Sequence, residues 1–263
     1  MRAAVAWVRE ELARAGCVSA AAEARWLVEE APRPADEQRL RAMVARRAAG
    51  EPLQYVVGWA PFGPLRLLVG PGVFVPRPET EGLAARAAGH LEDAPDPVAV
   101  DLCTGCGAIA CFLAVEVPGA RVLATELDPV ALAWARRNAG PHGVDVLAGD
   151  LDAPLPAELA GRVAVLTANV PYVPSAAIGT LPRDVRDHEP PLALDGGPDG
   201  LDVFRRVAAL APRWLAPGGV LLAEIGDDQG PAATALLEAA GLTGIAVHPD
   251  LVGRDRIVEG FRA

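Results

Sequence analysis

Apolar residues recur at helical spacing over the first 50 residues of the chain. Val5, Val8 and Leu12 follow one another at steps of three and four residues, and the same steps return later in the region. This spacing places apolar side chains on one face of a helix. Because proline breaks helices, the Pro-rich stretch 31–34 divides the region. Residues 1–50 are therefore expected to form a small helical bundle.

Two β-prone runs come next, over residues 53–58 and 65–69. They flank the stretch 59–64, which contains glycine and proline. Apolar and β-branched runs on either side of such a turn predict a β-hairpin. We expect this hairpin, within residues 51–75, to link the helical region to the rest of the chain.

After Pro97, short apolar runs alternate with helical patterns. Strands are expected at 98–102, 121–126, 144–147, 163–168 and 220–225, and helices at 108–117, from 128 onward and at 202–215. Asp128 followed by Pro129 is a typical helix start, with Asp as N-cap and Pro at the first helical position. Strands that alternate with helices imply a mostly parallel sheet covered on both faces. Residues 76–263 are therefore predicted to form an α/β domain.

A Gly-rich turn directly follows the first of these strands. Gly105 and Gly107 lie in this turn, and Glu126 ends the next strand about 20 residues later. Such a turn lets the backbone approach a ligand at a helix N-terminus. An acid at the end of the second strand can accept hydrogen bonds from both hydroxyls of a ribose. Dinucleotide enzymes and methyltransferases share this pattern, so it does not separate them.

The residues around the turn favour S-adenosylmethionine. Ala110 stands in place of a third glycine, and Asp101 leads the turn. A carboxylate there would attract the sulfonium and amino groups of S-adenosylmethionine, whereas it would repel a pyrophosphate. After the third strand, Asp150 could accept a hydrogen bond from the adenine amino group, and Leu151 could pack on the adenine face. The alternative is an α/β fold with ordinary strand-end turns. The expected cofactor contacts are Asp101, Cys103, Thr104, Gly105, Gly107, Glu126, Asp150, Leu151 and Asn169.

The segment Asn169-Val170-Pro171-Tyr172 directly follows the fourth strand. An amide nitrogen is a poor nucleophile because its lone pair is delocalised into the carbonyl. The Asn169 side-chain oxygen and a neighbouring backbone carbonyl could each accept one hydrogen of an NH2 group, which would turn the lone pair toward a methyl donor. Pro171 would stiffen the loop, and the Tyr172 ring could pack on a planar amide. We expect Asn169, Pro171 and Tyr172 to be catalytic; the alternative is an ordinary Asn in a strand-end turn.

At these residues the chain resembles the release-factor glutamine N5-methyltransferase family, whose acceptor motif is normally Asn-Pro-Pro-Tyr. The resemblance covers nearly the whole chain and includes residues 50–52, 76–81, 101–107, 189–190, 193–194, 217–219, 224–226 and 254–256. It implies a class I S-adenosylmethionine methyltransferase fold, which is Rossmann-like with a mostly parallel seven-stranded sheet. It also implies an N-terminal helical domain that docks the protein substrate, and the Gly-Gly-Gln loop of a peptide chain release factor as the target. The residues expected to bind the substrate are Arg77, Glu81, Asn169, Val170, Pro171 and Tyr172.

Two features depart from the family pattern. Val170 stands where the family usually has its first proline, so the backbone carbonyl is kept while the loop is less rigid. The N-terminal helical region is also shorter than is usual in the family. The resemblance extends to a branch of the family whose substrate is unsettled.

Two other functions fit parts of the same pattern. Adenine-N6 and other nucleic-acid amino methyltransferases have a similar acceptor motif and flip a base into the pocket. The net charge of -10 argues against them, because a protein that grips phosphates usually carries a basic surface. The other alternative is a binding protein that keeps the fold without catalysis. The intact Asn169, Tyr172 and glycine turn argue against that function.

The remaining sequence features concern location and metals. No apolar run reaches the roughly 18 residues of a membrane span, and charged residues soon follow the N-terminus. We therefore expect a soluble cytoplasmic protein. Cys103 and Cys106 have the spacing of a redox pair or of half a zinc site. No second pair at ligand spacing follows, so small residues in a tight turn are the preferred interpretation and no metal is expected.

Overall fold

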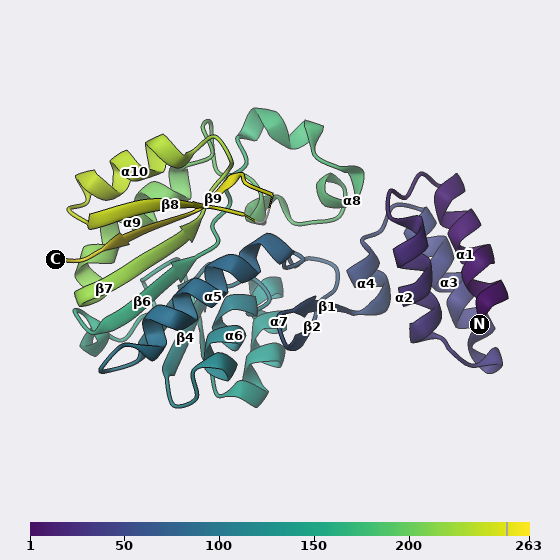
Figure 1. The fold of residues 1–263 in the computed structure, drawn as a ribbon, viewed down its shortest axis with the longest axis horizontal. Coiled ribbons are helices and arrows are strands. Elements are labelled where there is room, and N and C mark those ends of the chain that lie inside the picture. Colours follow the sequence, from purple (N-terminus) through teal and green to yellow (C-terminus); the bar gives the residue numbers. More distant parts are fainter. Residues whose placement is uncertain (251) are drawn as a thin grey trace.

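A computed structural model describes residues 1–250 and 252–263 of the chain. The N-terminal helices form a bundle at one end of the molecule, separate from the sheet (Figure 1). The helices of this region are α1 (Arg2–Arg14), α2 (Ala20–Glu30), η1 (Pro34–Asp36), α3 (Glu37–Ala48) and α4 (Leu53–Val57). Val8, Leu12 and Leu27 are fully buried between them. The helical periodicity of the sequence therefore predicted this bundle correctly.

The prediction of a β-strand over residues 53–58 is wrong, because this run forms helix α4. Its apolar residues point in two directions: Leu53 and Val56 pack into the N-terminal core, whereas Tyr55 packs into the core of the sheet domain. Three-residue spacing toward one core suits a helix. Gly58 ends the helix with a φ of +88°, in the left-handed region that favours glycine.

The expected hairpin is present, but its first strand lies at 59–62, after the run 53–58 that was expected to form it. Strand β1 (Trp59–Phe62) pairs antiparallel with β2 (Leu65–Leu68), with Phe62 opposite Leu65 across the turn. Asn138 on helix α7 (Pro129–Ala139) attaches the hairpin to the sheet domain, since its side chain bonds both the N–H and the carbonyl of Leu68. Figure 1 shows the hairpin between the bundle and the sheet domain.

The rest of the chain folds around one seven-stranded sheet. The strand order is β5-β4-β3-β6-β7-β9-β8, and β9 runs in the direction opposite to the other strands. The strands are β3 (Val98–Leu102), β4 (Arg121–Glu126), β5 (Asp145–Ala148), β6 (Val163–Ala168), β7 (Leu215–Glu224), β8 (Thr243–Pro249) and β9 (Asp255–Phe261). The longer helices are α5 (Pro78–Glu92), α6 (Ala108–Glu116), α7, α9 (Asp202–Trp214) and α10 (Gly230–Ala239). The mostly parallel seven-stranded fold is therefore confirmed.

Helices cover both faces of the sheet. Alternate residues of β3 point to opposite faces, as the pleat requires. Ala99 belongs to the core under α5, α6 and α7, whereas Val98 and Val100 belong to the core under α9 and α10. Both faces of the central strands are thus buried, which explains their unbroken apolar runs.

The position of β3 between β4 and β6 indicates where a ligand can bind. The chain moves from β3 to β4 on one side and to β6 on the other, so the winding direction reverses at β3. Ligands of such sheets bind beyond the carboxyl ends of the strands at this switch point. Leu102 pairs with Thr125 on one side and Ala168 on the other, so the three strands end side by side.

A long excursion leaves the sheet between β6 and α9. It contains η4 (Ser175–Thr180), α8 (Arg183–Arg186) and η5 (Pro191–Ala193). The carboxylate of Asp184 lies 3.5 Å from the guanidinium of Arg47, so the excursion reaches the N-terminal bundle. The short helices η2 (Gly140–His142) and η3 (Ala157–Leu159) complete the fold. Within the part of the chain that the structure describes, no helix is both long and apolar enough to span a membrane.

Candidate active site

A cavity of about 220 Å3 lies beyond the carboxyl ends of β3, β4 and β6. It brings together side chains that are far apart in the sequence, because parallel strands place their carboxyl ends at one edge of the sheet. The residues named from the sequence that line it are Asp101, Cys103, Thr104, Gly105, Glu126, Asp150, Leu151, Asn169, Pro171 and Tyr172. Cofactor and acceptor candidates therefore share one cavity.

Asp101 is a buried carboxylate in the cavity wall, with 1% of its surface exposed. It accepts hydrogen bonds from the hydroxyls of Thr104 at 2.6 Å and Thr167 at 2.7 Å. Burial raises the pKa of Asp101 to about 6, although both hydroxyl bonds oppose the shift. A cation in the cavity would stabilise the ionised form of this group.

Glu126, the last residue of β4, hydrogen-bonds to the backbone of the glycine turn. Its Oε2 accepts a hydrogen bond of 2.8 Å from the N–H of Gly105, and its Oε1 accepts one of 2.9 Å from the N–H of Asp128. A carboxylate oxygen can accept more than one hydrogen bond. Burial raises the pKa of Glu126. The carboxylate therefore positions the turn and can still accept from a pair of hydroxyls.

Two non-glycine residues in the cavity wall have left-handed backbones. The φ angles are +55° at Cys103 and +48° at Leu151. Residues with a Cβ rarely adopt this region, and such strain gathers at ligand sites. Both residues were expected from the sequence to contact the cofactor. Both left-handed residues follow the carboxyl ends of strands, β3 and β5, where a ligand would lie.

Asp150 stands at the rim of the cavity and is half-exposed. Its Oδ2 accepts a hydrogen bond of 2.7 Å from the guanidinium of Arg206 on α9. Within residues 1–250 and 252–263, no group donates a hydrogen bond to its Oδ1. Arg206 also lines the cavity, a feature that sequence reasoning did not find.

The amide of Asn169 is held from one side. Its Nδ2 lies 3.2 Å from both Thr80 Oγ1 and Glu224 Oε2. Thr80 in turn donates a hydrogen bond of 2.6 Å to Glu224. The Asn169 NH2 group therefore faces α5 and β7.

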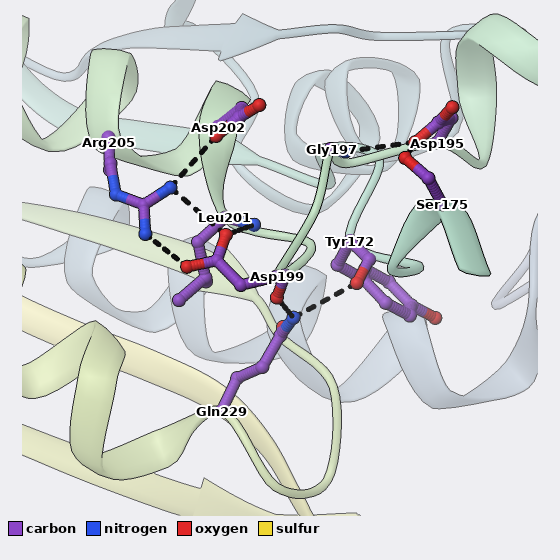
Figure 2. Close-up of polar contacts among 9 residues, drawn as sticks. All are labelled: Tyr172, Ser175, Asp195, Gly197, Asp199, Leu201, Asp202, Arg205 and Gln229. Atoms are coloured by element: carbon purple, nitrogen blue, oxygen red, sulfur yellow. Dashed lines mark hydrogen bonds and ion pairs between the residues drawn. The ribbon is translucent and has the colours of Figure 1, made fainter. Parts of the chain in front are cut away.

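Tyr172 is fixed through its side chain and through its backbone. Its hydroxyl donates to Glu224 Oε1 at 3.1 Å. The Tyr172 carbonyl accepts a hydrogen bond of 3.0 Å from Gln229 Nε2, which also donates to the carbonyl of Asp199 (Figure 2). Gly200, with a φ of +77°, lies against this junction, where a Cβ would collide with the Tyr172 carbonyl. The acceptor loop, which comprises residues 169–172, is thus hydrogen-bonded through Gln229 to the loop that contains Asp199.

Four residues named from the sequence do not line the cavity. Gly107 is the N-cap of α6, and a Cβ there would contact the backbone of α7 at 3.5 Å. Val170 is buried in the core. Arg77 lies with its guanidinium 4.7 Å from the ring centre of Phe74, which does line the cavity. Glu81 lies on the first turn of α5 and is partly exposed.

Comparisons with known proteins decide the family. Residues 29–58 match the model of the PrmC N-terminal domain. The release factor glutamine methyltransferase of Mycolicibacterium smegmatis is 49% identical over 224 residues, which cover 84% of this chain and 78% of the relative. That of Geobacter sulfurreducens is 37% identical, and the match covers 99% of this chain and 96% of the relative. This chain belongs to the release factor glutamine methyltransferase family.

A solved structure supports the fold of this family member. The methyltransferase from Pyrococcus furiosus superposes with a TM-score of 0.57 at 17% identity. The match covers 87% of this chain and 99% of that chain. The class I methyltransferase fold is therefore confirmed, as is the resemblance to the family that the motifs indicated.

Sequence reasoning missed three residues that hold the acceptor loop of this family member. Thr80 and Glu224 lie within the family-like segments 76–81 and 224–226 but had no expected role, and Gln229 lies outside those segments. Glu224 offered a signal: it is an acid at the end of an apolar strand, as Glu126 is. Gln229 offered none, because its role depends on the loops that it joins.

Burial disfavours thiolate chemistry at the Cys-x-x-Cys segment. It raises the pKa of the Cys103 thiol, and it raises that of Cys106 to about 12. A reactive or metal-binding cysteine needs the thiolate form. Over residues 1–250 and 252–263, no three His, Cys, Asp or Glu side chains are grouped as a metal site requires. Both thiols therefore favour the protonated form.

Proposed function

We propose that this family member transfers a methyl group from S-adenosylmethionine to the side-chain amide nitrogen of a glutamine, in the Gly-Gly-Gln loop of a peptide chain release factor. The observation that carries the proposal is Asn169, whose NH2 group is tied to Glu224 and Thr80 at the wall of the acidic cavity. The names of the relatives support the same activity. A release-factor substrate would place the reaction in the cytoplasm.

The cavity has the acceptor groups and the apolar surface that S-adenosylmethionine needs. Asp101 offers a buried negative charge for the sulfonium and amino groups. Glu126 offers carboxylate oxygens to the ribose hydroxyls. Leu151 offers an apolar surface to the adenine, and Asp150 an acceptor for its amino group. When bound, the cofactor supplies the electrophilic methyl group.

The acceptor loop can activate an amide without a strong base. Because Asn169 directs its NH2 toward Glu224 and Thr80, its Oδ1 is left to accept from the substrate NH2. The backbone carbonyl of Val170 would accept the second hydrogen. Two fixed acceptors hold the nitrogen so that its lone pair faces the methyl donor. The methylated nitrogen then loses its proton readily.

We also propose that the N-terminal bundle docks the protein substrate. One glutamine side chain offers too little surface to be chosen among many, so remote contacts must supply the selectivity. The divisions expected from the sequence were 1–50, 51–75 and 76–263. Because Leu53 and Val56 pack into the bundle core, we propose that the docking unit extends through α4 to Gly58.

Labelled S-adenosylmethionine tests the proposed acceptor. The protein is incubated with release factors and, separately, with duplex DNA, single-stranded DNA and RNA. Label on the Gly-Gly-Gln glutamine of a release factor, located by peptide mass mapping, is the expected result. The matched Asn169→Ala variant should give none. Label on nucleic acid alone would instead support an amino methyltransferase of bases.

A further inference from the structure

Glu224 lies at the carboxyl end of β7 and meets three donors of the acceptor site. It is 1% exposed. Its Oε2 accepts from Thr80 at 2.6 Å and from Asn169 at 3.2 Å, while its Oε1 accepts from Tyr172 at 3.1 Å. One carboxylate therefore contacts two of the three residues expected to be catalytic, Asn169 and Tyr172.

A carboxylate accepts hydrogen bonds and does not donate them. The half of the Asn169 amide that faces Glu224 must therefore be its NH2 group. A half-turn of the amide would bring Asn169 Oδ1 against Glu224 Oε2, and two acceptors would then meet without a proton between them. Such a buried contact is unfavourable because the hydrogen bond from Asn169 to Glu224 is lost and two oxygen acceptors repel each other. The position of Glu224 thus selects one of two amide orientations that have nearly the same shape.

Burial raises the pKa of Glu224, and the nearby Glu79 adds to this shift. The hydrogen bonds from Thr80 and Tyr172 and the charge of Arg256 on β9 oppose the shift and stabilise the carboxylate. No basic side chain neutralises Glu224 by direct contact in the described residues, so its lone pairs remain available to Asn169, Thr80 and Tyr172.

We propose that Glu224 is a positioning residue: it fixes the orientation of the Asn169 amide, so that Oδ1 faces the acceptor nitrogen, and it holds the Tyr172 hydroxyl. The proposal rests on the proposed function, in which Asn169 Oδ1 accepts from the substrate amide. Glu224 itself lies behind these two side chains and acts through them.

Glu224→Gln is the test variant because it keeps the shape and removes the charge. A glutamine can present either its oxygen or its NH2 group to Asn169, so both orientations of Asn169 become accessible. Glu238→Gln on the exposed face of α10 removes the same charge elsewhere and serves as the control. With release factor as substrate, kcat of Glu224→Gln should fall about 10- to 100-fold. KM, the Kd for S-adenosylmethionine and the unfolding temperature should stay as in the Glu238→Gln control.

A second measurement reads the amide directly. The chain has only two asparagines, Asn138 and Asn169. Labelling with 15N-asparagine therefore gives two side-chain NH2 signals. Glu224→Gln should shift the Asn169 signal and speed its hydrogen exchange. The Asn138 signal should not move, because that amide bonds the carbonyls of Leu68 and Cys106.

The two measurements separate this proposal from the proposed function. If the wild-type protein methylates no release factor, the proposed function fails, and the Asn169 signal still shows whether Glu224 orients the amide. An unmoved Asn169 signal in Glu224→Gln would overturn the positioning role. So would unchanged kcat, or a loss confined to KM, cofactor binding or stability.

Discussion

Gln229 Nε2 donates a hydrogen bond of 3.0 Å to the backbone carbonyl of Tyr172. The same NH2 group donates to the Asp199 carbonyl at 3.1 Å, and Gln229 Oε1 accepts from the N–H of Gly226 at 2.8 Å. One side chain, 6% exposed, thus joins the loops after β6 and β7 and the loop before α9 (Figure 2). The backbone of the acceptor loop depends on this junction.

We predict that Gln229→Glu lowers kcat about 100-fold near pH 8, because a carboxylate would face two carbonyl oxygens and loosen the loop. Burial and these oxygens would raise the pKa of the new carboxyl group. As pH falls it gains a proton and can donate one hydrogen bond, so part of kcat should return. Steady-state rates between pH 6 and 8 are the measurement. Gln229→Ala, which has no carboxyl group, should show no such recovery. Equal pH profiles for the two variants would contradict the role of the junction.

Asn169→Ala should abolish methyl transfer while cofactor affinity stays nearly unchanged. The variant removes the acceptor oxygen but leaves Glu224 bonded to Thr80 and Tyr172, so the wall should persist. Turnover on a release factor and calorimetric titration with S-adenosylmethionine check the two halves. Near-wild-type turnover would remove Asn169 from the mechanism.

Glu126→Ala should weaken S-adenosylmethionine binding by about 1–3 kcal/mol, the range for losing a charged hydrogen-bond acceptor. The loss has two sources, since Glu126 also holds the N–H of Gly105. Turnover at saturating cofactor should fall much less than affinity. The dissociation constant from calorimetry decides the matter, and an unchanged value would mean that the ribose lies elsewhere.

Cofactor affinity should weaken as pH falls through about 6, the pKa to which burial raises Asp101. Below that pH the carboxyl group is neutral, and binding a cation to its ionised form must release a proton. The Kd should then rise by up to about tenfold per pH unit. Titrations at pH 5, 6 and 7 in buffers of different ionisation enthalpy measure both the Kd and the released proton. Asp101→Asn should bind more weakly and lose most of this dependence. A wild-type Kd that is constant over this range would contradict the placement of a cation beside Asp101.

The sequence by itself determined the sheet domain and much of the cavity. Apolar runs predicted β3, β4 and β6, because strands buried on both faces leave that pattern. Asp128 accepts from the N–H of Val130 at the start of α7, as its cap position predicted. Residues at strand ends, such as Glu126 and Asn169, could be named because parallel strands bring their carboxyl ends together. Local pattern and one topological rule were sufficient for these features.

Only the tertiary structure decided the remaining features. The apolar run 53–58 suits a strand by sequence alone. It forms a helix because Leu53 and Val56 pack into the N-terminal core while Tyr55 packs into the core of the sheet domain. Thr80 and Glu224 stand 89 and 55 positions from the Asn169 that they hold, and Gln229 stands 57 positions from Tyr172. Hydrogen bonds over such separations leave no periodic pattern, since each depends on where separate strands and helices end in space. The sequence therefore named ten residues that line the cavity, and the fold alone showed which side chains hydrogen-bond to them.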